Sequence, residues 1–302
     1  MTREIFARPG EVRPDLTRTV LARGGRRVLV TDSVSFAARA RPADVVVTGS
    51  HGGLSAGEYA RRFGLGFLVC NDAGVGRNGA GVAGLRALDE TGVLGVAVGH
   101  RSARIGDGAD GWACGVITFV NETARGSGLR RGTSLREAVG GFLDRPAPVP
   151  APVPGPAPGG GEATKGRPML RQVVHEEEGR KVIVMDSISL IGPGDVGHVV
   201  VAGSNGGMAA AAAARAFKGA LVVLNDAGIG KDEAGVAGVR ALDADAIPAV
   251  AVGHLSAEIS DGRDTWENGV LSCVNETAAR AGLAAGQPVR AAVLGLLEAS
   301  HG

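Results

Sequence analysis

Residues 26–142 of this 302-residue chain recur without a gap at a constant offset of 154 positions, so that Asp32 corresponds to Asp186. Asn71-Asp72-Ala73-Gly74 corresponds in the same way to Asn225-Asp226-Ala227-Gly228. Repeats of solenoid proteins have periods of roughly 20–50 residues, so a repeat of this length is a whole domain. The sequence therefore predicts two related domains fused in one chain.

The composition changes between the two copies and marks the expected domain boundaries. Residues 144–168 are rich in Pro, Ala and Gly, which is typical of a linker. The first domain is then residues 1–143, with a lead-in at 1–25, and the second is residues 169–302. We expect the linker to let the domains pair as an intramolecular pseudo-dimer, with their relative orientation and any further oligomerisation left open.

Short apolar runs alternate with helical patterns inside each copy. In the first copy the runs lie at 28–30, 44–48, 66–70 and 93–98, and the helical patterns at 55–63, 80–90 and 112–125. Runs that are apolar on both faces are typical of parallel strands covered on both sides. The alternation predicts an α/β fold, a three-layer α/β/α sandwich with a mostly parallel sheet in each copy.

The charge and cysteine content narrow the functional class. The formal net charge is +1, which gives no general attraction to nucleic acid or membrane, and the longest apolar run is far short of a bilayer span. Cys70, Cys114 and Cys273 have no cysteine at the equivalent position of the other copy, so no disulfide or zinc cluster is repeated. With no export signal in the sequence, we expect a cytoplasmic protein. For the same reason we interpret Asn121 of the Asn-Glu-Thr triplet as a helix residue rather than a glycan acceptor.

Polar residues follow all four predicted strands of the first copy. Ligands of parallel sheets bind beyond the carboxyl ends of the strands, so these residues are the candidate site. They are Asp32, Ser33, Ser50, His51, Gly52, Gly53, Asn71, Asp72, Gly74, His100, Ser102, Arg104 and Asp107.

Catalytic roles are assigned first to His51, because histidine suits acid–base chemistry near neutral pH. Asp32 or Asp72 would orient its ring, and Ser50 or Ser33 would be the nucleophile or a hydrogen-bond donor. The alternative for His51 is a structural histidine satisfied by loop carbonyls. The second copy has Asn205 at this position, which favours the first copy as the active one.

Substrate binding is assigned to the remaining strand-end residues. Arg104 would hold an anionic group together with the amides of Gly52, Gly53, Ala73 and Gly74. Asn71, Ser102 and Asp107 would line the same site. The alternative for the glycines is a tight turn in which only glycine fits. His100 recurs as His254, which suits either a structural hydrogen bond or a site formed across the domain pair.

No cofactor is expected from the sequence. Asp32, His51, Asp72, His100 and Asp107 could converge on a divalent metal ion, which is kept as an alternative although the spacings typical of metal sites are missing. Residues 74–79 spell a dinucleotide fingerprint, but they follow the third strand, and Glu233 replaces the last glycine in the second copy.

The segment Ser50-His51-Gly52, followed by a strand and then residues 68–76, resembles the caspase-like CHAT peptidases. In that family a catalytic His-Gly ends one strand and a Cys-x-x-Gly segment ends the next. The resemblance implies an α/β sheet of the same general kind and a degenerate peptidase as an alternative function. It departs from the family where Asn71 stands in the nucleophile position, because Cys70 is one residue early and would point to the opposite side of the strand.

The sequence as a whole favours an enzyme acting on a small anionic metabolite, a hydrolase or lyase with its site in the first copy. The first alternative is a metabolite-binding or sensing protein that performs no chemistry. A purely structural pseudo-dimer is the second, and it is disfavoured because the repeated residues are mainly polar and lie in loops.

Overall fold

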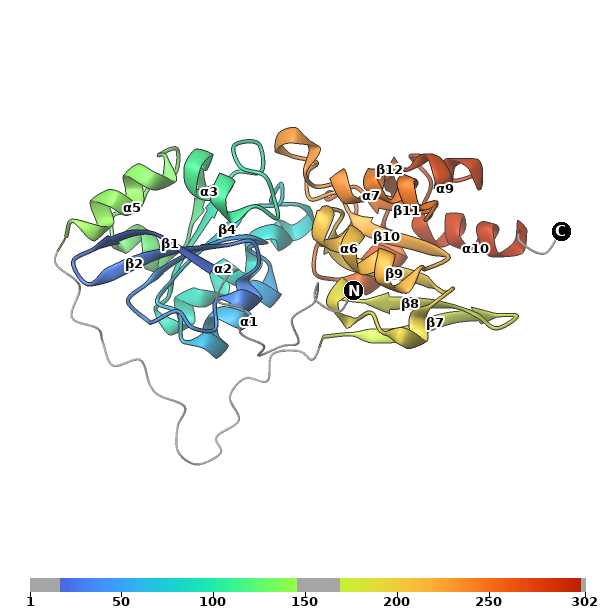
Figure 1. Cartoon of the computed structure of the whole chain (residues 1–302), viewed down its shortest axis with the longest axis horizontal. Helices are drawn as coiled ribbons and strands as arrows, with labels where there is room; N and C mark the ends of the chain where they lie inside the picture. Colours follow the sequence, from blue (N-terminus) through green and yellow to red (C-terminus); the bar gives the residue numbers. More distant parts are fainter. Residues whose placement is uncertain (1–16, 146–168, 300–302) are drawn as a thin grey trace, which may run out of the picture.

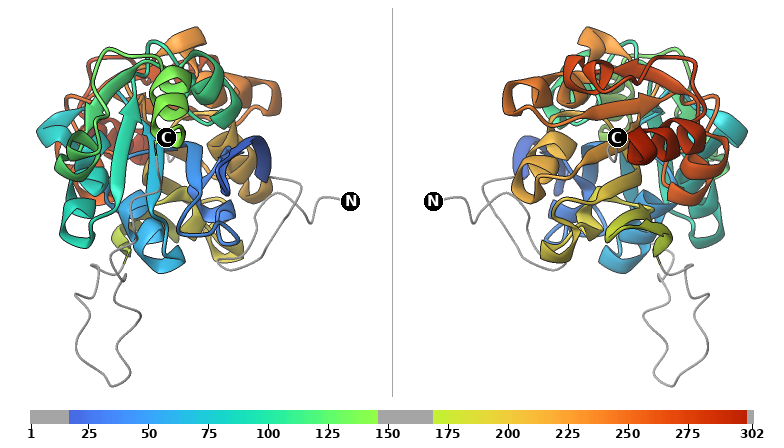
Figure 2. Two further views of the ribbon diagram at one scale, coloured as in Figure 1. Left: turned by 90° about the vertical axis from the view of Figure 1, so that its left-hand side faces the viewer. Right: turned by 90° about the vertical axis from the view of Figure 1, so that its right-hand side faces the viewer.

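Two six-stranded mixed sheets form the framework of the chain in a computed structural model that describes residues 17–145 and 169–299. Figure 1 shows the two halves side by side, the first coloured blue to green and the second yellow to red, and Figure 2 views the same arrangement from both ends. Two halves with equivalent sheets fit a tandem duplication. The predicted linker falls almost entirely outside the described residues.

The first half contains a sheet of order β1-β2-β3-β4-β5-β6. Strands β2 to β5 are parallel, and β1 and β6 pair antiparallel at the two edges. The elements are β1 (Thr17–Arg23), β2 (Arg26–Thr31), β3 (Val45–His51), α1 (Leu54–Phe63), β4 (Phe67–Asn71), α2 (Ala83–Ala87), β5 (Leu94–Val98), α3 (Gly108–Cys114), β6 (Ile117–Val120), α4 (Glu122–Gly126) and α5 (Leu135–Leu143).

The second half repeats this order in the sheet β12-β11-β10-β9-β8-β7. Its elements are β7 (Arg171–Glu177), β8 (Arg180–Met185), β9 (Val199–Asn205), α6 (Met208–Phe217), β10 (Leu221–Asn225), α7 (Ala237–Ala241), β11 (Ala249–Val252), α8 (Gly262–Asn268), β12 (Leu271–Val274), α9 (Glu276–Arg280) and α10 (Val289–Ala299).

Each sheet buries both of its faces, which explains why its central strands are mainly apolar, with polar residues such as Thr48 and Asn71 toward their carboxyl ends. In β3, Val45 and Val47 pack on one face against the core that contains α5, while Val46 packs on the other face against α1 and α2. Alternate side chains of a strand point to opposite faces, so a run without polar residues needs cover on both sides. The structure confirms the predicted α/β class and the mostly parallel sheet in each half.

Two predicted helices of the first copy are wrong in detail. Residues 112–125 contain the edge strand β6 between α3 and α4, because Gly115 ends the first helix and Ile117–Val120 pairs with β5. Residues 80–90 form only a short α2, flanked by 3₁₀ turns at Arg77–Val82 and Leu88–Thr91. Strand β1, in the predicted lead-in, was not expected as a strand.

None of the described helices is both long enough and apolar enough to cross a membrane. Asn121, read from the sequence as a helix residue, is the N-cap of α4, and its side chain is buried.

Candidate functional site

The two halves meet through the loops that follow the central strands β4 and β10. Ala73, Ala80 and Ile105 of the first half form a small apolar cluster with Ala227 and Ile259 of the second. At the centre of this junction a Cβ added to Gly228 would lie 3.0 Å from the Cα of Gly74. The strand ends that the sequence predicts as a ligand site therefore also form the contact between the halves.

Both junction loops have strained backbone conformations. Ala73, Gly74, Val75 and Gly76 are consecutive residues with positive φ, and residues 227–230 repeat the pattern. Positive φ is unusual for a β-branched residue such as Val75, and its equivalent Ile229 shares it. Such strain persists only where the surrounding structure imposes it, and it is concentrated at binding and catalytic sites. The repeated strain singles out these loops within the described chain.

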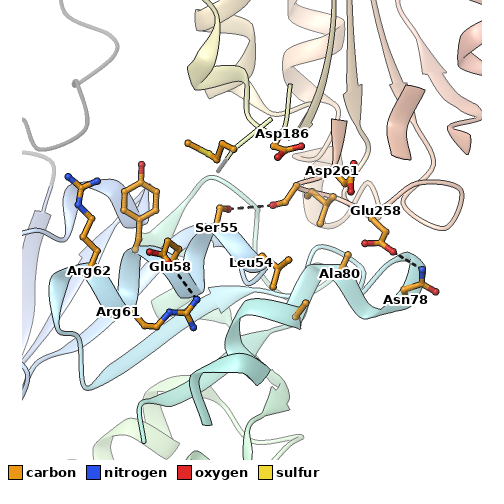
Figure 3. Close-up of a pocket in the computed structure, with 15 residues that line it drawn as sticks. Leu54, Ser55, Glu58, Arg61, Arg62, Asn78, Ala80, Asp186, Glu258 and Asp261 are labelled. Carbon is orange, nitrogen blue, oxygen red and sulfur yellow. Dashed lines mark hydrogen bonds and ion pairs between the residues drawn. The ribbon is translucent and has the colours of Figure 1, made fainter. Parts of the chain in front are cut away.

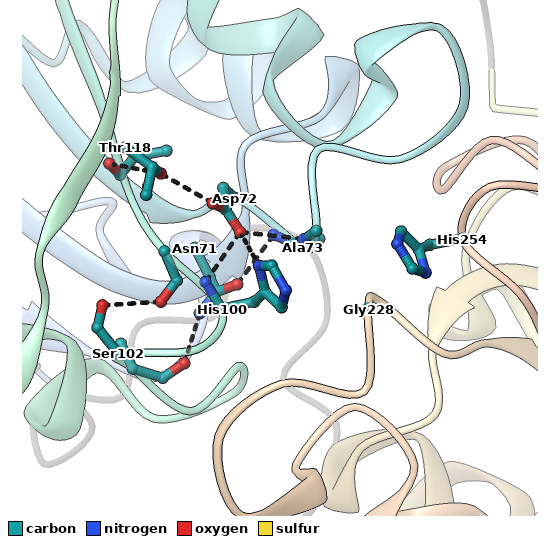
Figure 4. A network of polar contacts seen from close by, with 12 residues as sticks. Asn71, Asp72, Ala73, His100, Ser102, Thr118, Gly228 and His254 are labelled. Carbon is teal, nitrogen blue, oxygen red and sulfur yellow. Dashed lines mark hydrogen bonds and ion pairs between the residues drawn. The ribbon is translucent and has the colours of Figure 1, made fainter. Parts of the chain in front are cut away.

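Asp72 and His100 form a close carboxylate–imidazole pair at this junction (Figure 4). Asp72 Oδ1 lies 2.8 Å from His100 Nδ1 and also accepts hydrogen bonds from the amides of Gly74 and His100. Asp72 Oδ2 accepts a hydrogen bond from the hydroxyl of Thr118, 2.8 Å away. These contacts place the carboxylate firmly against the ring.

The protonation states follow from this geometry. Burial of Asp72 raises its pKa, but the hydrogen bonds from His100, Thr118 and Gly74 outweigh that effect and hold the pKa below its usual value. An ionised Asp72 accepts only, so in the neutral form of His100 the proton is on Nδ1 and the lone pair is on Nε2. A histidine in this state is a candidate general base.

The second half repeats the arrangement. Asp226 Oδ1 lies 2.9 Å from His254 Nδ1, and Ser272 takes the place of Thr118 with a 2.8 Å hydrogen bond to Asp226 Oδ2. The same balance of burial against hydrogen bonds lowers the pKa of Asp226. The Asp72–His100 and Asp226–His254 pairs are called the two dyads below.

The dyads face each other across the junction glycines. A Cβ on Gly228 would meet His100 Nε2 at 3.3 Å, and one on Gly74 would meet His254 Nε2 at 3.1 Å. Within the described residues neither Nε2 has a hydrogen-bond partner. The side chains of His100 and His254 are 19% and 24% exposed, so both rings remain reachable from solvent.

His51 occupies a different position from the one expected for an acid–base residue. Its Nδ1 accepts a hydrogen bond from the amide of Gly53 at 3.1 Å, and its Nε2 lies 3.5 Å from Ser260 Oγ of the other half. Burial lowers the pKa of His51 to about 4, so the ring is neutral at pH 7. With Nδ1 accepting, the proton is on Nε2, and no lone pair is left to act as a base.

The expected ring-orienting carboxylates serve other groups. Asp32 Oδ1 accepts a hydrogen bond from the amide of Gly108, and Asp72 holds His100. Among the described residues no hydrogen bond joins His51 to either aspartate. Ser50 Oγ accepts from the amide of Val34, so it links two loops of the same half.

The backbone amides expected to hold an anion all have acceptors within the protein. Gly52 donates to the backbone oxygen of Asn71 and Gly53 donates to His51. Ala73 and Gly74 donate to the side chains of Asn71 and Asp72. Added Cβ atoms on Gly52 and Gly53 would approach Leu85 and the His51 ring within 2.8 Å, so close packing accounts for these glycines.

The guanidinium of Arg104 is surrounded by carboxylates. It pairs with Asp107 and Asp110 of its own half and with Asp232 of the other half, at 2.9–3.2 Å. Hydrogen bonds to Asp232 and Asp107 raise the pKa of Arg104. The structure thus gives Arg104 a role in joining the halves, and Asp107 also caps the start of α3.

The remaining predicted site residues stabilise the strand-end loops. Ser33 caps a 3₁₀ turn, Asn71 donates to the backbone oxygen of Ala103, and Ser102 accepts from the amide of Val116. Of the predicted residues, Asp72 and His100 are the pair that the structure joins as a carboxylate and an imidazole 2.8 Å apart. The sequence signal for it is that Asp, His and a hydroxyl residue recur in both copies.

The described residues include no group of three or more His, Cys, Asp or Glu side chains placed to hold a metal ion. All three cysteines are free thiols. Cys70 is buried in the core, and burial raises the pKa of its thiol to about 12, so it is not a source of thiolate.

A cavity of about 400 Å³ lies elsewhere on the junction, between α1 and the residues that precede α8 (Figure 3). Leu54, Tyr59 and Ile259 are among its apolar lining residues. This site is not among the sequence predictions, which assign residues 55–63 to a helix and give that helix no part in binding. The difference between the polar α1 and its alanine-rich counterpart α6 is the signal that could have revealed it.

No known family model matches the chain, and no curated protein or solved structure is significantly similar to it.

Proposed function

We propose that this protein is an enzyme that transfers protons on a small-molecule substrate, as a hydrolase or a lyase. The observation that supports this is the Asp72–His100 dyad, in which a carboxylate fixes Nδ1 and leaves the lone pair of Nε2 available. A histidine held in this way can take a proton from a water molecule or from a carbon acid. The dyad of Asp226 and His254 is the equivalent base in the second half.

No serine or cysteine among the described residues is bonded to either Nε2, which favours activated water or direct proton abstraction over a covalent intermediate. The proposed base therefore moves from His51 to His100. The expected preference for an anionic substrate loses its main support, because Arg104 is already neutralised by three carboxylates.

The same proposal includes the origin and location of the protein. We infer that the halves arose by duplication of a three-layer α/β/α domain and pair about a pseudo-two-fold axis. Reciprocal contacts support this inference, since Arg77 and Lys231 make equivalent backbone hydrogen bonds to His254 and His100. The free cysteines are consistent with the proposed cytoplasmic location.

The second candidate is a binding or sensing protein that performs no chemistry. The cavity between the halves favours it, because a ligand there would contact both halves without touching the residues of either dyad. A cysteine peptidase is not carried forward, since Cys70 is buried and protonated.

The test is a panel of amide, ester, phosphoester and elimination substrates, followed by variants of the dyads on any substrate that is turned over. His100→Gln combined with His254→Gln should lower kcat/KM by about 10²–10⁴-fold. Asp72→Asn should lower it while shifting the pH profile, because the ring loses its fixed tautomer. His175→Gln, on the edge strand β7, is the matched control and should leave turnover unchanged.

Two results would contradict the proposal. Full turnover by the double histidine variant would remove the dyads from the mechanism. A ligand that stabilises the protein but is not converted under any condition of the panel would favour the binding protein instead.

A further inference from the structure

The cavity between the halves has a different lining on its two sides. Its wall on the first half is helix α1, which presents Ser55, Glu58, Tyr59 and Arg62. The repeat places Ala209, Ala212, Ala213 and Ala216 of α6 at the equivalent positions. The polar and aromatic side chains on this wall therefore belong to the first half alone.

Much of the cavity lining is apolar. Leu54 and Tyr59 belong to α1 of the first half, and Ile259 and Met169 line the cavity from the second half. Leu54 is 63% exposed although it is a large aliphatic side chain, which is costly unless something covers it. A pocket of this kind favours a ligand with an apolar or aromatic body.

The charges on the lining are unbalanced. Glu58, Asp186, Glu258 and Asp261 contribute four carboxylates, against the two guanidinium groups of Arg61 and Arg62. The 3.1 Å ion pair between Arg61 and Glu58 neutralises one charge of each sign and leaves the excess of carboxylates unchanged. A concave site with an excess of one charge concentrates ligands of the opposite charge. This lining therefore favours a cation over an anion.

Two hydroxyl groups close the cavity between the halves. Ser55 Oγ of α1 lies 3.4 Å from Ser260 Oγ of the second half, and both residues line the cavity (Figure 3). Position 260 is Gly106 in the other copy, and position 55 is Ala209, so the repeat does not reproduce this hydroxyl pair. The pair supplies donors and acceptors suited to a polar ligand head.

We propose that this cavity binds a small organic amine, a protonated amino group carried on an apolar or aromatic body. The amino group lies among the carboxylates and the Ser55–Ser260 hydroxyls, and the body packs against Leu54, Tyr59 and Ile259. Binding here does not depend on the dyads, whose residues do not line the cavity.

The test uses three probes of similar shape on the full chain at pH 7: 2-phenylethylamine, 3-phenylpropan-1-ol and 3-phenylpropanoate. Titration calorimetry should show saturable binding of the amine, at least about tenfold tighter than binding of the alcohol or the carboxylate. The His100→Gln and His254→Gln double variant should bind the amine as well as the native chain does, so failure of the proposed chemistry would not affect this result.

Two variants locate the site. Ser55→Trp fills the cavity and should abolish amine binding, whereas Ala209→Trp, at the equivalent exposed position of α6, should not. The double variant Glu58→Gln and Glu258→Gln keeps the size of both side chains. It should weaken binding of the amine by about tenfold and leave binding of the alcohol unchanged. The proposal is overturned if the carboxylate probe binds as tightly as the amine, if the amine shows no saturable binding up to about 10 mM, or if Ser55→Trp has no effect on it.

Discussion

The backbone amide of Arg77 donates a hydrogen bond to the backbone oxygen of His254, 2.8 Å away in the other half. Lys231 makes the equivalent bond to His100, also at 2.8 Å. The histidines of the two dyads are therefore also the residues to which the opposite halves attach. A change that separates the halves should displace both dyads, which couples the proposed chemistry to the integrity of the junction.

Gly74→Ala should weaken the junction. Gly74 has φ of +74°, and an added Cβ would lie 2.8 Å from the His254 ring. Gly132→Ala is the control, because Gly132 has φ of +82° but no atom within 4 Å of the added Cβ. Both variants meet a left-handed strain of about 1–2 kcal/mol. We expect Gly74→Ala to lower the free energy of unfolding, measured in urea, by at least about 1 kcal/mol more than Gly132→Ala does, because the His254 ring must move. Equal losses would show that the close approach at the junction is not important for stability.

His51→Asn should remove part of the acid sensitivity of the fold. Burial lowers the pKa of His51 from 6.5 to about 4, so folding favours the neutral ring. Its contribution to stability is fully present above pH 6.5 and is lost as the pH falls toward 4. Asn205 shows that asparagine fits, since its side chain accepts from Gly207 at the same 3.1 Å as His51 does from Gly53.

The measurement for this variant is urea unfolding at pH 7 and at pH 4.5, with the His51 ring titrated by NMR in the native chain. The variant should lose less stability than the native chain between the two pH values. A ring that titrates near its ordinary pKa of 6.5 would contradict the prediction.

Asn121→Ala should be strongly destabilising. The buried amide of Asn121 donates to the backbone oxygens of Leu85 and Val93 and accepts from the amides of Gly95 and Ala124. Its removal leaves several buried groups without partners, and we expect a loss of about 3 kcal/mol in the free energy of unfolding. Asn268→Ala, at an exposed position, should cost less than about 1 kcal/mol. Thermal unfolding of both variants under the same conditions measures the two losses in stability.

Arg104→Glu should lower the melting temperature more than Arg104→Ala does. The new carboxylate would face Asp107, Asp110 and Asp232, which now surround a cation. Adding Asp232→Lys to Arg104→Glu should recover part of the loss, because it restores an opposite pair across the junction. The differences in melting temperature between these variants should become smaller in high salt, because salt screens exposed charges. A melting temperature unaffected by Arg104→Glu would mean that these ion pairs do not stabilise the junction.

The sequence by itself determined the construction of each half. Apolar runs such as Val45-Val46-Val47 indicate a buried strand without knowledge of its neighbours, because a strand covered on both faces favours apolar side chains on both. The constant offset that relates Asp32 to Asp186 predicts a second copy of this construction, and the two equivalent sheets fit that prediction. Asn121 was assigned to a helix only because the sequence lacks an export signal, and the structure makes it the N-cap of α4.

The tertiary structure alone decided which strand-end residues act together. Asp72 was predicted to lie in the site, but its pairing with His100 rather than with His51 depends on how the loops after β4 and β5 fold over each other. The cavity beside Tyr59 depends on residues more than a hundred positions apart, such as Ser55 and Ser260. Local patterns specify strands and helices because backbone and burial preferences act over a few residues. Contacts between loops and between halves depend on the packing of the whole chain, which no local pattern encodes.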